Sequence, residues 1–344
     1  MTIKAAAPEV SVVIPLRDEE KHIDHCLESL FAQDFPAERL EVLLVDGMSA
    51  DGTRGRVAAW QTRYPGIRLL DNPGRTAPRA MNIGIRAARG RYIVRLDAHS
   101  SYAPDYISKC LLYLEKTGAD NVGGVIETRG KGFWGTAIAL MLSSRFGVGN
   151  ASFRVGAADG YADTVPFGAF RREAFERYGY YDERLTRNQD YELNYRIRRQ
   201  GGKIYLANEI KLTYYSRSSV RAIAGNAFGN GKWNIITSFL CPGSMSARHY
   251  APLAFVLSLL LLPPAAVFIS PVFRYALTAE LALYLLLALG FSAAAARRPL
   301  PHGHPAPPPA YFAALLFLFP LFHISYGCGS VAGLGWRVSR KSAL

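Results

Sequence analysis

The sequence predicts an α/β protein in which a Rossmann-like, mostly parallel sheet is followed by C-terminal interfacial and transmembrane helices. Short apolar runs alternate with segments of helical spacing up to about residue 216, which is typical of βαβ units. Charged residues occur throughout that region. Three long apolar stretches then follow, 251–273, 275–296 and 310–336, and only the second contains a charged residue, Glu280. Each stretch has the ~20 apolar residues that cross a bilayer.

The first two elements are predicted from the residues around Pro15. Residues 10–14 form a short apolar run that Pro15 stops, which indicates a buried strand. Apolar residues then recur at helical spacing between Asp18 and Phe31. Asp18 is the expected N-cap of this helix, because a carboxylate there can accept hydrogen bonds from the N–H groups of the first turn.

Five further elements lead to the end of the predicted sheet. They alternate as strand, helix, strand, helix, strand, over residues 41–45, 55–64, 67–70, 77–89 and 91–97. Gly90 is the expected C-cap of the second of these helices. Such alternation implies right-handed βαβ units and a parallel sheet, with the functional site along the carboxyl edge of the strands.

Polar side chains follow three of the predicted strands at that edge. They are residues 15–19, Asp46, and Asp97 with His99. In an extended segment, residues i and i+2 point to the same face, so Asp97 and His99 can jointly hold one divalent cation. A carboxylate and an imidazole suit Mg²⁺ or Mn²⁺, which also take substrate phosphates. The alternative is an ordinary aspartate at the end of a strand beside a surface histidine.

Several classes of protein are excluded or disfavoured by the sequence. No G-x-G-x-x-G follows the first strand and no G-x-x-x-x-G-K-[ST] occurs, so dinucleotide and P-loop binding lack their phosphate loop. The net charge of +13 fits an anionic membrane surface and anionic substrates. The basic residues form no tract with interleaved aromatics, so we expect no nucleic-acid partner. The four cysteines are scattered, which fits a reducing compartment.

Hydropathy predicts four regions along the chain. They are an α/β domain at 1–216, interfacial amphipathic helices at 217–250, a membrane domain of about three hydrophobic segments at 251–336 and a basic tail at 337–344. Because no secretory signal precedes the first strand, we expect the α/β domain in the cytoplasm. Three full spans then place the tail outside, whereas its basic residues favour the cytoplasm. A re-entrant hairpin around Pro320 in the third stretch is one solution.

Ordered motifs in the first part of the chain resemble family 2 glycosyltransferases with the GT-A fold. The motifs are SVVIPLRDEE at 11–20, VDGMSADGT at 45–53, Asn82-Ile83-Gly84, and the Asp97-Ala98-His99 strand end. The resemblance covers about residues 9–235. Within that family the chain looks most like the succinoglycan-biosynthesis ExoA type, membrane-attached transferases that extend a lipid-linked oligosaccharide.

The resemblance implies roles for the residues at matching positions. Pro15, Arg17 and Glu19 are expected to line the nucleotide pocket, and Asp46 to accept hydrogen bonds from the uracil or ribose. Arg79, or alternatively Arg75, is expected to approach the base or the diphosphate. Asp97 is expected to face the ribose and the metal. His99 stands where most relatives have the second aspartate of a D-x-D pair, so the resemblance leaves the choice between Mn²⁺ and Mg²⁺ open.

Two further segments carry candidate residues. Residues 186–196 resemble the stretch where relatives have Glu-Asp; here the pair is Gln189-Asp190, and Asp190 takes the place of the catalytic base. An early carboxylate on a helix is also simply a good cap. Lys232 and Trp233 stand near the Gln-x-x-Arg-Trp of processive relatives. Lys232 is a candidate for the donor diphosphate and Trp233 for the acceptor sugar, with an interfacial Lys-Trp anchor as an equally weighted alternative.

These features together predict an inverting glycosyltransferase of the bacterial inner membrane. It is expected to move a hexose such as glucose from a nucleoside-diphosphate sugar, UDP-linked, to a polyprenyl-diphosphate-linked glycan in extracellular polysaccharide synthesis. A polyprenyl-phosphate sugar synthase and a non-catalytic nucleotide-sugar-binding membrane partner are the alternatives. The partners are the sugar nucleotide, the lipid-linked acceptor and membrane lipid, and whether the chain forms a homo-oligomer is left open.

Overall fold

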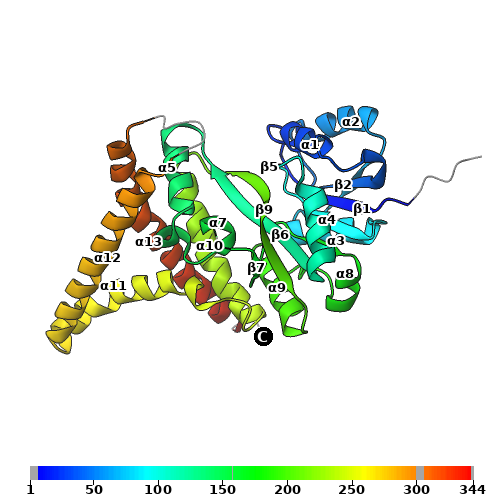
Figure 1. Cartoon of the computed structure of the whole chain (residues 1–344). Coiled ribbons are helices and arrows are strands. Elements are labelled where there is room, and N and C mark those ends of the chain that lie inside the picture. Colours follow the sequence, from blue (N-terminus) through cyan, green and yellow to red (C-terminus); the bar gives the residue numbers. More distant parts are fainter. Residues whose placement is uncertain (1–6, 157, 300–305, 342–344) are drawn as a thin grey trace, which may run out of the picture. The chain divides into compact units, whose positions relative to one another are not determined.

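The computed structural model describes residues 7–156, 158–299 and 306–341, and the chain divides into two compact units (Figure 1). The first unit consists of residues 1–127 and 156–214, and the second of residues 128–155 and 215–344. The segment 128–155 lies inside the range 1–216 predicted for the α/β domain. It nevertheless groups with the C-terminal helices.

A mixed sheet forms the centre of the first unit. Among the described residues nine strands follow the order β3-β2-β1-β4-β8-β6-β9-β5, with β7 beside β9. Their bounds are β1 Val10–Leu16, β2 Leu40–Asp46, β3 Ile67–Asp71, β4 Tyr92–Arg95, β5 Ser100–Tyr102, β6 Asn121–Arg129, β7 Gly160–Tyr161, β8 Ala169–Arg171 and β9 Ile204–Tyr215. Strands β1 to β4 are parallel, as predicted, while β8 joins β4 antiparallel.

Helices with one apolar face pack on the parallel strands. The helices of the first unit are α1 Ile23–Phe31, η1 Ala37–Arg39, α2 Thr53–Arg63, α3 Ala77–Ala87, α4 Tyr106–Thr117, α8 Glu173–Tyr178 and α9 Gln189–Arg199. Helix α3 lies close against β1 because of Gly84. A Cβ atom there would lie 2.4 Å from Cγ1 of Val13, so only glycine allows this approach.

Three local predictions at the ends of these elements were wrong. Helix α1 begins at Ile23, and Asp18 is no N-cap: it has a φ of +55° and its carboxylate accepts a hydrogen bond from the backbone N of Ala50. Strand β1 continues through Pro15, because β4 has already ended beside it and the missing N–H costs no ladder hydrogen bond. Gly90 is no C-cap; a Cβ there would lie 2.6 Å from the backbone N of Ser11.

A buried carboxylate ties the amino ends of β1 and β2 together. Glu41 is 2% exposed and accepts hydrogen bonds from Ser11 Oγ at 2.5 Å and Arg89 Nε at 3.0 Å. Burial raises the pKa of Glu41, but these hydrogen bonds outweigh it, so the pKa lies below its ordinary value. At a pH above the pKa that Glu41 has in the unfolded chain, the ionised carboxylate therefore stabilises the folded state. This stabilisation is lost as the pH falls through the lower pKa that Glu41 has in the folded state.

We expect Glu41→Gln to lower the free energy of unfolding by about 2 kcal/mol at pH 7, because charge-assisted hydrogen bonds become ordinary ones. The difference between wild type and variant should shrink as the pH falls from 7 to a value below the lowered folded pKa, where the wild-type carboxylate is protonated. Urea unfolding at both pH values, followed by circular dichroism, measures it. A difference that does not change with pH would contradict the account.

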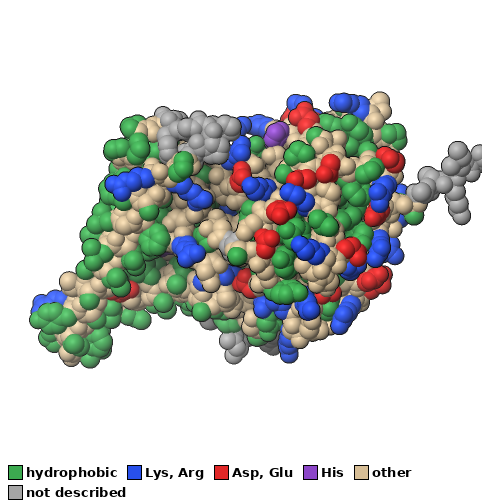
Figure 2. All heavy atoms as spheres, in the orientation of Figure 1, with side chains coloured by type: hydrophobic (Ala, Val, Ile, Leu, Met, Phe, Trp, Pro, Cys, Tyr) green, Lys and Arg blue, Asp and Glu red, His purple; other side chains and the backbone are tan. Residues whose placement is uncertain are grey.

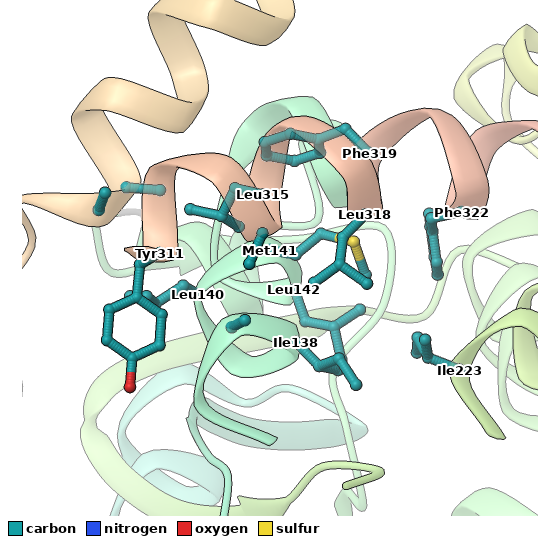
Figure 3. Packing of buried hydrophobic residues seen from close by; sticks show 14 of the residues in the cluster. Ile138, Leu140, Met141, Leu142, Ile223, Tyr311, Leu315, Leu318, Phe319 and Phe322 are labelled. Atoms are coloured by element: carbon teal, nitrogen blue, oxygen red, sulfur yellow. The ribbon is translucent and has the colours of Figure 1, made fainter. Parts of the chain in front are cut away.

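The second unit is a bundle of helices. Its helices are α5 Gly132–Leu142, α6 Arg145–Val148, α7 Ser152–Val155, α10 Val220–Leu240, η2 Ala247–His249, α11 Ala251–Phe268, α12 Val272–Ala296 and α13 Pro308–Lys341. Its core joins α5 to α13, where Ile138 and Met141 pack near Leu315, Leu318 and Phe319 (Figure 3). The segment 128–155 belongs to this unit because α5 is apolar on all sides and buries itself against α13.

Three helices of the second unit are long and apolar enough to cross a membrane, namely Ala251–Phe268, Val272–Ala296 and Pro308–Trp336. Large apolar side chains stand exposed on α11 and α12, such as Leu261 and Phe268 at 61% and 84%. The end formed by these two helices is covered by hydrophobic side chains on the face seen in Figure 2. An exposed apolar surface of this kind is expected of helices that face lipid.

The hairpin considered for the third apolar stretch was wrong, because α13 is one continuous helix through Pro320. Its glycines serve close packing rather than a turn. A Cβ at Gly329 would lie 1.9 Å from the carbonyl oxygen of Phe228 on α10, and one at Gly231 of α10 the same distance from that of Tyr326. In the predicted basic tail, residues 337–341 continue the helix, while their side chains and residues 342–344 lie outside the described part.

Candidate active site

The loops after β1 and β2 are joined at the carboxyl edge of the sheet. Leu16 lies opposite Asp46 in the parallel register, so the two chains leave the sheet side by side. Backbone N atoms of one loop donate to side chains of the other: Asp18 N to Ser49 Oγ at 2.9 Å, Glu19 N to Thr53 Oγ1 at 2.8 Å and Gly52 N to Glu20 Oε2 at 3.2 Å. The predicted convergence of these strand ends is thus present in the structure.

His99 lies between two carboxylates at this edge. Its Nδ1 is 3.0 Å from Oε1 of Glu19 and 3.1 Å from Oδ1 of Asp97. Tyr102 holds the loop after β4 in place, because its hydroxyl accepts a hydrogen bond from the backbone N of Asp97 at 2.6 Å. The ring of His99 also meets that of Tyr214 edge-on, with centroids 6.2 Å apart. Glu19 therefore joins the pair that the sequence singled out.

This cluster suits a hard divalent cation. Two carboxylates and one imidazole offer the oxygen and nitrogen atoms that Mn²⁺ and Mg²⁺ accept. Across the described ranges, no group of three or more His, Cys, Asp and Glu side chains is arranged to hold an ion by itself. Glu19, Asp97 and His99 would therefore need further ligands such as substrate phosphates to hold an ion, as Mg²⁺ sites commonly have.

Asp46 is fully buried and its carboxylate is already engaged. It accepts hydrogen bonds from the Ser49 backbone N at 3.2 Å and from Arg54 Nη1 at 3.0 Å. Arg54 also donates to Oδ1 of Asp71 at 2.8 Å through Nη2, so it bridges the ends of β2 and β3. The sequence analysis missed Arg54. Its signal was its place in the first turn of the helix that follows Asp46.

The two candidate arginines after β3 differ in their surroundings. Arg79 on α3 forms an ion pair with Glu183, 3.1 Å from Nε to Oε2. Arg75 is exposed, and its φ of +57° lies in the left-handed region that non-glycine residues rarely adopt. Asn82 of the third motif donates to the carbonyl of Tyr181 and accepts from its backbone N, both at 2.9 Å. Asn82 therefore fixes the loop in front of α9.

The remaining candidates lie at the carboxyl end of β1 or in the second unit. Pro15 lies inside β1 opposite Val45, and Arg17 is half exposed, with Nε 3.5 Å from Oδ2 of Asp18. Lys232 and Trp233 lie on α10 of the second unit, where both are partly buried. The roles given to these residues from the resemblance stay predictions.

Asp190 opens α9 as its second residue, after Asn188 with a φ of +63°. Its neighbour Gln189 is 6% exposed, whereas the Asp190 side chain is 34% exposed, so the aspartate is the accessible member of the pair. The expected buried face is formed by Leu193 and Ile197. Asp190 Oδ2 lies 3.7 Å from Nη1 of Arg95, a buried residue of β4 that the sequence analysis did not single out.

Comparisons with known proteins agree on one family. Residues 11–179 match the sequence profile described as Glycosyl transferase family 2. The chain is 32% identical over 251 residues to the succinoglycan biosynthesis protein ExoA of Rhizobium meliloti, which covers 71% of this chain and 76% of that protein. It is 30% identical over 220 residues to a dolichyl N-acetyl-α-D-glucosaminyl phosphate 3-β-D-2,3-diacetamido-2,3-dideoxy-β-D-glucuronosyltransferase of Methanococcus voltae, covering 62% of this chain and 68% of that one.

A solved structure shows the same fold. The mannosyltransferase PcManGT from Pyrobaculum calidifontis, in complex with GDP-Man and Mn²⁺, superposes with a TM-score of 0.60 at 20% sequence identity. The likeness covers 95% of this chain and 87% of the mannosyltransferase. At this identity the likeness shows the fold alone, which is the predicted GT-A fold.

Proposed function

The chain belongs to glycosyl transferase family 2, and from that membership we propose that it moves a hexose such as glucose from a UDP-sugar to a polyprenyl-diphosphate-linked glycan. The names of the relatives given above support a lipid-linked glycan as the acceptor. One is a succinoglycan biosynthesis protein, and the other is named for a dolichyl-linked sugar phosphate. The product would be a lengthened lipid-linked oligosaccharide for an extracellular polysaccharide.

The observation that carries this proposal is the set of side chains at the carboxyl edge of the sheet. Glycosyl transfer needs a stabilised diphosphate leaving group and a base for the acceptor hydroxyl. Asp97 and His99, with Glu19 beside them, would hold Mn²⁺ or Mg²⁺, which supplies Lewis-acid stabilisation of the diphosphate. Asp190 would take the proton from the acceptor hydroxyl.

Inversion at the anomeric carbon, typical of the family, fits a single base. The acceptor oxygen forms the new bond to the anomeric carbon while the bond to the diphosphate oxygen breaks with its electron pair. The acceptor proton would go to Asp190, and the electron pair would stay on the departing diphosphate, whose negative charge a cation held by Asp97 and His99 would stabilise. No protein nucleophile takes part, so the configuration inverts once.

The three apolar helices support a membrane location for this activity. We propose the bacterial inner membrane, with the catalytic part on the cytoplasmic side where sugar nucleotides are made. The exposed apolar side chains of α11 and α12 would face lipid. The side of the C-terminal tail is measured by a C-terminal reporter fusion, since an odd number of spans leaves the tail outside.

A donor screen with the full-length protein in membranes tests the proposed function. UDP-, GDP- and TDP-hexoses are offered with Mn²⁺ or Mg²⁺ and short polyprenyl-diphosphate-linked glycans. We expect sugar transfer from a UDP-hexose. Transfer to bare polyprenyl phosphate instead would identify a polyprenyl-phosphate sugar synthase. Binding of a sugar nucleotide without turnover on any acceptor would favour a non-catalytic binding partner.

A second test asks whether Lys232 and Trp233 on α10 bind the substrates or anchor the helix at the membrane. If Lys232 contacts the donor diphosphate, Lys232→Ala should raise the KM for the donor by about 10-fold, the value of one charge-assisted contact. If the pair only anchors the helix at lipid headgroups, turnover and donor affinity should stay at wild-type values, and membrane extraction should become easier.

A further inference from the structure

Arg95 is a buried charge in the middle of the sheet. It lies on β4, which is an inner strand of the sheet between β1 and β8. Its side chain is 8% exposed. A buried guanidinium is costly unless carboxylates or hydrogen bonds compensate it. At this position an apolar residue would continue the run Tyr92–Val94 and pack well. The arginine therefore needs an explanation beyond the stability of the sheet.

The guanidinium of Arg95 lies beside the carboxylate of Asp190 and two aromatic rings. Nη1 lies 3.7 Å from Oδ2 of Asp190, and the guanidinium lies 5.6 Å from the ring centre of Phe167 and 6.0 Å from that of Tyr181. Phe167 has a φ of +51°, a strained conformation for an aromatic residue. Burial lowers the pKa of Arg95, but the interactions with Asp190, Tyr181 and Asp97 outweigh it and raise the pKa. The cation thus lies in the field of both carboxylates.

The hydrogen bonds of Arg95 are incomplete. Among the described residues, its buried Nε and Nη1 have no hydrogen-bond partner. The 3.7 Å to Asp190 is an ion-pair distance beyond the range of a hydrogen bond. By contrast Arg171, on the neighbouring strand β8, donates to Glu115 Oε1 and to the carbonyl of Leu114, both at 2.9 Å. Both Nη atoms of Arg171 thus have hydrogen-bond partners, whereas Nε and Nη1 of Arg95 have none among the described residues.

We propose that Arg95 is a positioning residue, which fixes the carboxylate of Asp190 toward the acceptor and balances its charge while the donor diphosphate is bound. The inference rests on the proposed function of Asp190 as base. The open ion pair closes to a hydrogen bond when the acceptor hydroxyl approaches, because catalytic hydrogen bonds tighten in the substrate complex. The loop that carries Tyr181 supports the arrangement from the side, since Asn82 holds its backbone.

The test compares Arg95→Gln, Arg95→Lys and the control Arg171→Gln in the transfer assay. We expect Arg95→Gln to lower kcat by about 10- to 100-fold with an unchanged KM for the sugar nucleotide, because misplacing one catalytic group costs this much. Arg95→Lys should recover part of the loss. Arg171→Gln should lower the Tm and leave kcat unchanged.

A double-mutant cycle with Asp190→Asn separates positioning from a general loss of structure. If Arg95 acts through Asp190, Arg95→Gln should change kcat by less than about 3-fold in the Asp190→Asn background. Equal losses in both backgrounds, or an unaffected kcat in Arg95→Gln, would overturn the inference and leave the proposed function standing. If Arg95→Gln does not fold, Arg95→Lys enters the cycle in its place. A wild-type protein that transfers no sugar would overturn both.

Discussion

We expect Asp190→Asn to lower kcat for sugar transfer by about 10²- to 10⁴-fold, the usual contribution of a general base. The amide keeps the shape of the side chain but cannot accept the proton of the acceptor hydroxyl. The KM for the sugar nucleotide should change little, since the donor-binding residues that we propose lie in the loops after β1, β2 and β4. Steady-state transfer to a lipid-linked acceptor, at saturating donor and metal, measures the loss.

A matched control separates catalysis from helix capping. Asp190 lies in the first turn of α9, and Glu173 lies in the first turn of α8. Both carboxylates interact favourably with the N-terminal end of a helix, and each interaction stabilises the fold by about 0.3–1 kcal/mol. Glu173→Gln should therefore lower the Tm by the helix-end contribution alone and leave kcat at the wild-type value, whereas Asp190→Asn also removes the ion pair of the buried Arg95 and should lower the Tm further. Full activity of Asp190→Asn would refute the assignment of the base.

The parallel part of the sheet was predictable because its signals are local. Apolar runs of strand length alternate with helical spacing, and the carboxyl ends of parallel strands must meet at one edge. That logic placed Asp46, Asp97 and His99 together without any knowledge of side-chain positions. It said nothing of the antiparallel strand β8, because β8 has only three residues and pairs with β4 and β6, which are distant from it along the chain.

The errors arose where a tertiary contact overrode a local preference. Asp18 has the chemistry of an N-cap, but the loop after β2 offers the backbone N of Ala50 at 2.8 Å, and the helix starts five residues later. Gly90 follows a helix as a C-cap would, yet its role is the close approach to Ser11. In each case the competing partner is distant along the chain, so no local pattern could reveal it.

The site residues missed by the sequence analysis are both arginines beside carboxylates. Arg54 bridges Asp46 and Asp71, and Arg95 faces Asp190, 95 residues away along the chain. One signal was available for Arg95, because a charge inside an apolar strand run must find a partner once it is buried. Which carboxylate would serve was not predictable, since that depends on how β8 and α9 return to the sheet.

Asp97→Asn is the second substitution from which we expect a large loss, about 10²- to 10³-fold in kcat/KM. The amide removes the negative charge that would attract the cation to the donor diphosphate. Chelation of the wild-type protein with EDTA should abolish transfer, and added Mn²⁺ should restore it. In Asp97→Asn, the Mn²⁺ concentration needed for half-maximal rate should rise. Unchanged metal dependence would remove Asp97 from the site.

His99 decides how the cation is held, because it can act as a ligand or only orient Glu19 and Asp97. Removing an orienting group weakens metal affinity by about 10- to 100-fold, so His99→Gln should need more Mn²⁺ yet reach a near-normal rate at saturation. His22→Gln is the control; the ring of His22 lies 6.5 Å from that of His99, and its replacement should leave metal affinity unchanged.

His99→Asp restores the aspartate pair of most relatives. If His99 is a ligand, this harder oxygen donor should raise the rate with Mg²⁺ relative to Mn²⁺. If His99→Asp shows the same metal preference as His99→Gln, the imidazole acts only by holding the two carboxylates in place.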